Sequence, residues 1–247
     1  MPILILFLVF NLIACATSFD KRGRYHKVRT GESIWRIAKA YRVSLQELAE
    51  FNNIFSPNDV KVGMRLYIPK REKRAAFKKL PFDGVSKGGR RRGKRPRRYR
   101  YASSKKIQTY RGKFIWPVNG RLSSRFGIRN GRRHDGIDIT AKRGTPIKAA
   151  SSGKIVFSGK MRGYGNLVLI RHKGDFFTAY AHNHRNKVRK GKMVKRGQVI
   201  ASVGRTGRAS GNHLHFEIRR GQTARNPLFF LPERAERKRS KAYARGN

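Results

Sequence analysis

The fold of the C-terminal half of this chain is decided by the stretch His213-Leu214-His215-Phe216-Glu217-Ile218-Arg219. Apolar and polar side chains alternate through it, and a period of two is the pattern of a β-strand. Its leucine, phenylalanine and isoleucine would face a core. Its two histidines and its glutamate would then share the opposite face. The stretch therefore predicts a strand with one apolar face toward the core and one face of candidate functional side chains.

A second stretch supplies matching groups about eighty residues earlier, and it reads His134-Asp135-Gly136-Ile137-Asp138. His134 and Asp138 together with His215 make a three-ligand set of two imidazoles and one carboxylate, which suits zinc and leaves a fourth position for water. Carboxylates are scarce in this half of the chain, so their presence beside histidines favours a metal site. We expect one zinc ion per chain.

Two further histidines are candidates for proton transfer at this site. His213 shares the strand face of His215, and His182 follows in the run Tyr180-Ala181-His182. Side chains of this kind can orient a water molecule, remove its proton and stabilise an oxyanion. His182 and His213 are therefore the predicted catalytic residues.

Short β-rich runs separated by Gly and Pro fill the rest of this half. They lie at 147–150, 154–157, 166–171, 176–181, 199–203 and 213–219. Strands at this spacing predict an all-β sandwich or barrel without crossover helices.

These motifs come with others in a fixed order: FIWPVNG (114–120), SSRFG (123–127), GTPIKAA (144–150) and GYGN (163–166). Residues 113–232 thereby resemble a lysostaphin-type (LytM-like) zinc endopeptidase domain. The resemblance implies a barrel-like antiparallel sheet with a duplicated hybrid motif and hydrolysis of peptide bonds in bacterial peptidoglycan. It also implies metal ligands at His134, Asp138 and His215, and catalytic histidines at His182 and His213.

A smaller unit is expected at 26–69, in the order strand, helix, helix, strand. Apolar residues at helical spacing follow Thr30, its expected N-cap, and Ser44 begins a second helix. With VRTGESIW (28–35), NNI (52–54) and VGMRLYIP (62–69), this unit resembles a LysM domain. The resemblance implies binding of N-acetylglucosamine-containing glycan by Gly31, Glu32, Ser33, Ile34, Asn53 and Ile54. The alternative is that these residues only cap a small fold.

The composition is strongly basic, with a formal net charge of +47. Such a charge implies a polyanionic neighbour, and nucleic acid, an anionic membrane and an acidic wall polymer all qualify. The basic residues are dense at 70–112, where few apolar side chains accompany them, so a disordered linker is expected there. Residues 233–247 are expected to form a loose basic tail.

The N-terminus predicts export. The apolar run 3–10 has the length of a signal segment, and Leu12-Ile13-Ala14-Cys15 resembles a bacterial lipobox. Residues 1–14 would then be a lipoprotein signal peptide and Cys15 the acylated residue; the alternative is an uncleaved anchor. The mature chain would lie on the periplasmic face of the outer membrane in a Gram-negative cell, or otherwise on the cell surface. It would contact the membrane through Cys15 and the basic linker and would meet peptidoglycan rather than nucleic acid.

Lipobox, LysM and LytM-like domain in this order also resemble the outer-membrane lipoproteins that activate cell-wall amidases during division. Those regulators usually have degraded catalytic residues, whereas every position is filled here. Two hypotheses follow: a peptidoglycan endopeptidase, and a non-enzymatic activator whose partner is a cell-wall amidase or a division protein.

Overall fold

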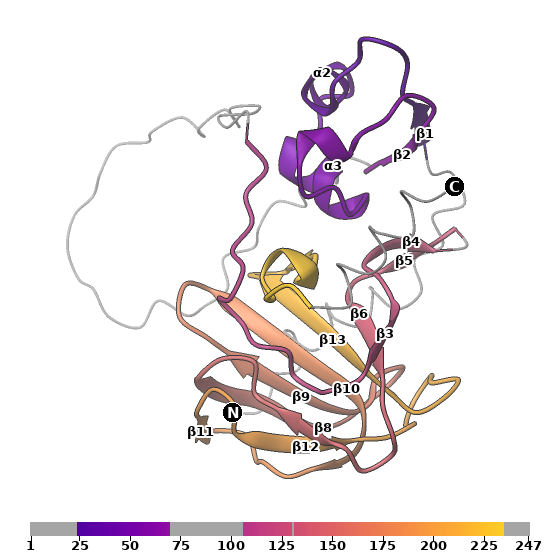
Figure 1. Cartoon of the computed structure of the whole chain (residues 1–247). Coiled ribbons are helices and arrows are strands. Elements are labelled where there is room, and N and C mark those ends of the chain that lie inside the picture. The colour runs from indigo at the N-terminus through magenta and orange to yellow at the C-terminus, as the bar shows by residue number, and fades with distance from the viewer. Residues whose placement is uncertain (1–23, 70–105, 130, 235–247) are drawn as a thin grey trace, which may run out of the picture.

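The computed structural model describes residues 24–69, 106–129 and 131–234, and it shows a mainly β protein with a small helical unit beside a large sheet (Figure 1). The predicted fold class is confirmed. The expected signal peptide, Cys15, most of the expected linker and most of the expected C-terminal tail lie outside the described residues. Within the described part of the chain, no helix has the length and apolarity needed to cross a membrane.

The small unit has the predicted order of elements. They are β1 (Arg24–Lys27), α2 (Ile34–Ala40), α3 (Leu45–Phe51), the 3-10 turn η2 (Pro57–Asp59) and β2 (Arg65–Ile68). The strands β1 and β2 pair in antiparallel fashion. Ser44 caps α3 as expected, but the N-cap of α2 is Ser33 rather than Thr30. Ser33 takes the cap because its backbone is extended and its hydroxyl accepts a hydrogen bond from the Arg36 amide.

The larger unit is built on one antiparallel sheet of ten strands. Its strands are β3 (Arg121–Ser124), β6 (Ile137–Thr140), β7 (Pro146–Lys148), β8 (Gly153–Met161), β9 (Gly165–Arg171), β10 (Phe176–Asn186), β11 (Met193–Val194), β12 (Val199–Val203), β13 (His213–Arg220) and β14 (Thr223–Arg225). The main path runs β11-β8-β9-β10-β13-β6-β3, and β12 joins it by pairing with the end of β10 and with β7. All six predicted β runs are strands.

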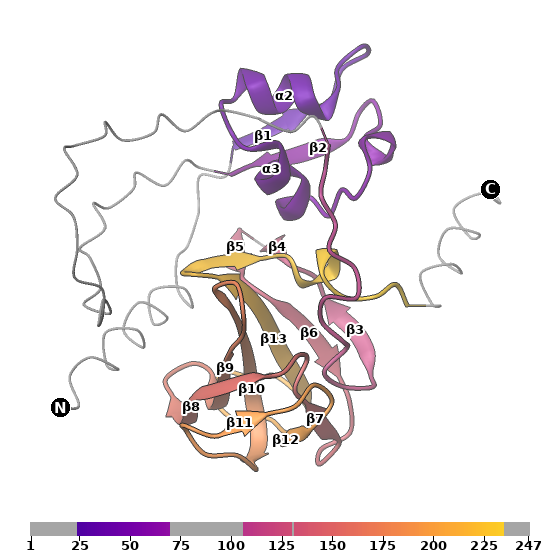
Figure 2. The same ribbon diagram turned by 90° about the vertical axis from the view of Figure 1, so that its left-hand side faces the viewer.

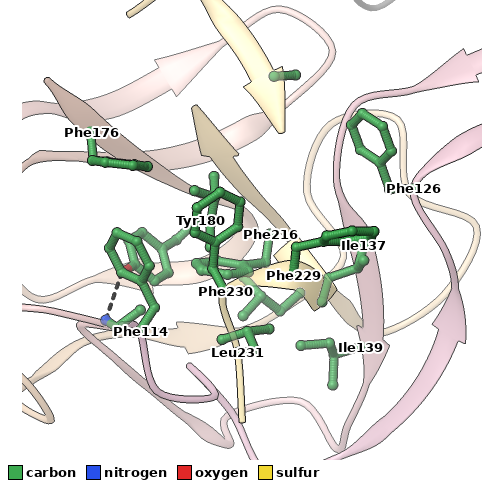
Figure 3. Packing of buried hydrophobic residues seen from close by; sticks show 14 of the residues in the cluster. Phe114, Phe126, Ile137, Ile139, Phe176, Tyr180, Phe216, Phe229, Phe230 and Leu231 are labelled. Carbon is green, nitrogen blue, oxygen red and sulfur yellow. Dashed lines mark hydrogen bonds between the residues drawn. The ribbon is translucent and has the colours of Figure 1, made fainter. Parts of the chain in front are cut away.

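The core lies on the side of β13 that the alternation predicts. Leu214, Phe216 and Ile218 are fully buried, and Figure 3 shows Phe216 among the aromatic rings of this core. Tyr180 is also buried here, and its hydroxyl accepts a hydrogen bond from the Ala150 amide at 2.8 Å. The one polar atom of this side chain is therefore satisfied inside an apolar cluster.

A separate hairpin projects from the sheet toward the small unit (Figure 2). It consists of β4 (Gly127–Arg129) and β5 (Arg132–His134), which pair with each other and with no other strand in the described residues. The sequence did not predict this hairpin, because its short runs of arginine and glycine carry no alternation. It matters for function because His134 ends β5.

The last part of the segment expected as linker differs from that expectation. Ile107 is buried, and Gln108 exchanges hydrogen bonds with Gln46 of α3. Tyr110 stacks on Phe230, the C-cap of the 3-10 turn η3 (Pro227–Phe229). The density of basic residues placed the end of the expected linker at residue 112. The structure shows instead that its last residues contact both units.

Candidate metal centre

Three strands bring the predicted ligands together. His134 ends β5, while Asp138 in β6 stands directly opposite His215 in β13 in the antiparallel register. The Nε2 atom of His134 lies 3.1 Å from Oδ1 of Asp138 and 3.2 Å from Nδ1 of His215. The remaining separation, from Nδ1 of His215 to Oδ1 of Asp138, is 2.9 Å.

The donor set fits zinc. Bonds of 2.0–2.1 Å in a tetrahedral centre place neighbouring ligand atoms about 3.3 Å apart, and the separations here are within a few tenths of an ångström of that figure. Two imidazoles and one carboxylate are also the ligand types that zinc takes in catalytic sites. The group His134, Asp138 and His215 therefore has the geometry expected of a three-ligand zinc site.

Each histidine ligand uses its second ring nitrogen to hold its orientation. Nδ1 of His134 donates to the carbonyl of Arg125 at 2.7 Å, so Nε2 is left to face the site. Nε2 of His215 lies 3.1 Å from Oε1 of Glu217, so Nδ1 faces the site. Partners of this kind fix the tautomer and the ring plane of a metal ligand.

Glu217 lies at the centre of a buried polar network. Oε1 also accepts from the hydroxyl of Tyr164 at 2.8 Å, and Oε2 accepts from the guanidinium of Arg219 at 2.8 Å. Burial alone would raise the pKa of Glu217, but its partners His215 and Arg219 outweigh that effect and hold the pKa below its usual range. The sequence predicted that Glu217 shares a strand face with His215 but indicated no role for it. Its alternation with His215 was the only sequence feature that pointed to the site.

The charged side chains within the site support one another. Burial would raise the pKa of Asp138, yet hydrogen bonds from His134 and His215 hold it well below its usual range. Burial would likewise lower the pKa of His215, but Asp138 and Glu217 raise it. The site therefore keeps an ionised carboxylate ready for a cation.

The predicted catalytic histidines stand side by side next to the ligands. The ring centroids of His182 and His213 are 4.8 Å apart, and that of His182 is 6.0 Å from the ring of His215. Nδ1 of His182 donates to the carbonyl of Thr206 at 2.7 Å, and Nδ1 of His213 donates to the carbonyl of Gly211 at 2.9 Å. Nδ1 of each ring is thus occupied, and Nε2 is the nitrogen left for proton transfer.

His182 occupies an unusual backbone position. Its φ is +62°, at the point where the pairing of β10 with β9 changes register. A left-handed conformation at a non-glycine residue is strained, and such strain is concentrated at functional sites. Burial lowers the pKa of His182 to about 4, with the nearby charge of His215 adding to the effect, so the ring is neutral at neutral pH.

Several of the residues expected to bind glycan have structural contacts within the small unit. Ile34 and Ile54 are buried in the core of the small unit, and Ser33 caps α2. Glu32 accepts hydrogen bonds from His26 and from the Arg29 amide. Gly31 is exposed and has open space where a side chain would be.

Asn53, the remaining one of these residues, lies between the two units. It donates a hydrogen bond to the carbonyl of Phe126 at 3.1 Å and accepts one from Asn226 at 3.0 Å. The glycan contacts of this group remain predictions.

Comparison with known proteins agrees with both resemblances. The model of peptidase family M23 matches residues 132–227, and the LysM domain model matches residues 26–69. The chain is 37% identical over 211 residues to the uncharacterized lipoprotein YgeR of Escherichia coli, covering 85% of this chain and 82% of that one.

Other relatives match over the C-terminal half. The murein hydrolase activator NlpD of E. coli is 44% identical over 133 residues, covering 53% of this chain and 34% of NlpD. The cell division protein DipM of Caulobacter vibrioides is 37% identical over 134 residues, covering 51% of this chain and 22% of DipM. The chain thus spans about a third or less of the length of these two relatives. With the family model covering the residues of the candidate metal centre, and a relative matched along most of its length, the chain belongs to peptidase family M23 and carries an N-terminal LysM domain.

Proposed function

We propose that this chain is a zinc-dependent endopeptidase that cleaves peptide bonds of bacterial peptidoglycan. The observation that carries the proposal is the convergence of all five predicted groups. His134, Asp138 and His215 form the ligand triangle, and the rings of His182 and His213 lie next to it. Retention of the two histidines outside the triangle favours catalysis, because metal binding alone does not require them.

The roles of the two histidines follow from their hydrogen bonds. Zinc, when bound, supplies a Lewis acid that activates water and polarises the scissile carbonyl. His182 is neutral at neutral pH, and its Nε2 lone pair can take the proton of the attacking water. His213, with its Nδ1 held by a carbonyl, can hold or donate a proton at Nε2 toward the oxyanion or the leaving amine.

The rest of the chain would place this site at its substrate. We propose that the LysM domain binds glycan through the exposed turn at Gly31 and its neighbours, and that acylated Cys15 anchors an exported lipoprotein. The basic segment would add attraction to anionic lipid headgroups or acidic wall polymers. Tethering of this kind raises the effective concentration of substrate peptides without any new catalytic contact.

A second candidate is a non-enzymatic activator of a cell-wall amidase. The observation that favours it is the 44% identity to NlpD, which bears the name murein hydrolase activator. In that function the metal face would serve as a binding surface for a partner protein.

Mass spectrometry of muropeptides separates the two candidates. Purified sacculi are incubated with the full chain in zinc and in chelator, beside His215→Ala and His213→Ala. Zinc-dependent loss of cross-linked dimers that both substitutions abolish would establish the endopeptidase. If the folded, zinc-loaded chain releases nothing alone but stimulates an added amidase, the activator is correct.

A further inference from the structure

The LysM domain is docked on the peptidase domain through the end of α3. Glu50 is 3% exposed, and its carboxylate accepts hydrogen bonds from the guanidinium of Arg225 and, at 3.2 Å, from the amide of Asn226. The side chain of Asn226 returns a bond to the Glu50 carbonyl at 2.9 Å. Buried charges that are paired and hydrogen-bonded in this way define one orientation of the two surfaces.

Aromatic side chains close the same interface. Phe51 lies against Phe126 with ring centroids 5.3 Å apart, and Phe55 stacks on Phe229 at 4.5 Å. The two domains approach each other closely enough here to require a glycine. A Cβ atom on Gly127, whose φ is +122°, would lie only 2.6 Å from the carbonyl oxygen of Phe51.

One contact of this interface leads directly to the metal centre. The side-chain amide of Asn53 donates to the carbonyl of Phe126 at 3.1 Å. The preceding carbonyl, that of Arg125, accepts the hydrogen bond that orients His134, at 2.7 Å. The next residue, Gly127, pairs with His134 in the β4–β5 hairpin. The LysM domain therefore holds the main-chain segment against which the metal ligand rests.

We propose that Asn53 is a positioning residue for the metal centre, and that the docked LysM domain is thus a structural part of the zinc site. Asn53 holds the carbonyl of Phe126 in place by its hydrogen bond. This restrains the adjacent main chain, including the carbonyl of Arg125. The Arg125 carbonyl in turn orients the ring of His134. The proposal rests on zinc binding in the proposed function. It also means that the Asn53 amide is occupied while the domains are docked, so this side chain serves the metal site and not a glycan in that state.

The test is the zinc dissociation constant of the full chain, measured by competition with a chromophoric chelator. Asn53→Gly removes the amide and suits the left-handed backbone, whose φ is +55°. Asn53→Asp keeps the size of the side chain and loses the donor. The matched control is Asn52→Ala, because Asn52 bonds only to Leu48 and Tyr67 of the LysM domain among the contacts described. The melting temperature of each metal-free variant is recorded beside its zinc affinity.

We expect both Asn53 variants to raise the zinc dissociation constant about tenfold, the low end of the 10–100-fold range for outer partners of metal ligands. Asn52→Ala should lower the melting temperature and leave the zinc affinity of the folded chain unchanged. The proposal is overturned if either folded Asn53 variant binds zinc as the wild type does, or if Asn52→Ala weakens zinc binding equally. A wild-type chain that binds no zinc would instead overturn the proposed function, and the inference with it.

Discussion

Substitution of Glu50 by alanine should weaken the contact between the two domains and lower the free energy of unfolding. Oε2 of Glu50 lies 2.9 Å from Nε of Arg225, Oε1 lies 2.5 Å from Nη2, and the two side chains are only 4% and 17% exposed. Removing one partner of a buried pair costs about 3–5 kcal/mol, since the other charge is left unpaired. Arg225 keeps some contact with solvent, so we expect a loss of about 3 kcal/mol in the free energy of unfolding, the lower end of that range.

The two tryptophans of the chain provide the assay, because Trp35 lies in α2 of the LysM domain and Trp116 lies in the peptidase domain. Urea unfolding is followed by fluorescence in Trp35→Phe and Trp116→Phe backgrounds. The two transitions should coincide in the wild type, and the Trp35 transition should move to lower urea in Glu50→Ala. The double variant Glu50→Met/Arg225→Met should recover most of the loss, since it leaves no buried charge.

An exposed ion pair is the control. Glu233→Ala breaks the contact of Glu233 with Arg111, whose side chains are 52% and 35% exposed, and a pair of this kind contributes at most about 1 kcal/mol. The reasoning would be refuted if Glu50→Ala cost no more than this control. It would also be refuted if the stability losses of Glu50→Met and Arg225→Met, each measured alone, simply added up in the double variant.

Three further results are expected. Asp138→Asn should abolish stoichiometric zinc in the purified chain, measured by elemental analysis, because the site loses its charged ligand; full zinc content would contradict the assigned ligand set. Glu217→Gln should weaken zinc binding about 10–100-fold by chelator competition, because it loosens the partner of His215, and an unchanged affinity would show that Glu217 serves packing alone. His172 has its pKa lowered by burial, so the folded chain binds fewer protons than the unfolded chain and stability falls as pH drops below about 6.5. His172→Gln should flatten the melting temperature between pH 7.5 and pH 5, and an unaltered slope would assign that loss to other groups.

The groups that sequence reasoning missed are mostly main-chain atoms. The carbonyls of Arg125, Thr206 and Gly211 orient His134, His182 and His213. A carbonyl has the same chemistry in every residue, so no residue type marks it in a sequence. The side chain of Glu217 could be placed on the correct strand face, but its network with Tyr164 depends on residues 53 positions apart.

The sequence by itself predicted most of the strands, both helices, the proposed ligand set and the two catalytic candidates, because alternation, capping and histidine spacing act through neighbours along the chain. Only the tertiary structure decided which ring nitrogen faces the site, and where Asn53 and Glu50 point. The directions of Asn53 and Glu50 depend on contacts between segments more than seventy residues apart, those of Asn53 with Phe126 and of Glu50 with Arg225. Such pairings form only when the two domains pack together, and no local pattern encodes them.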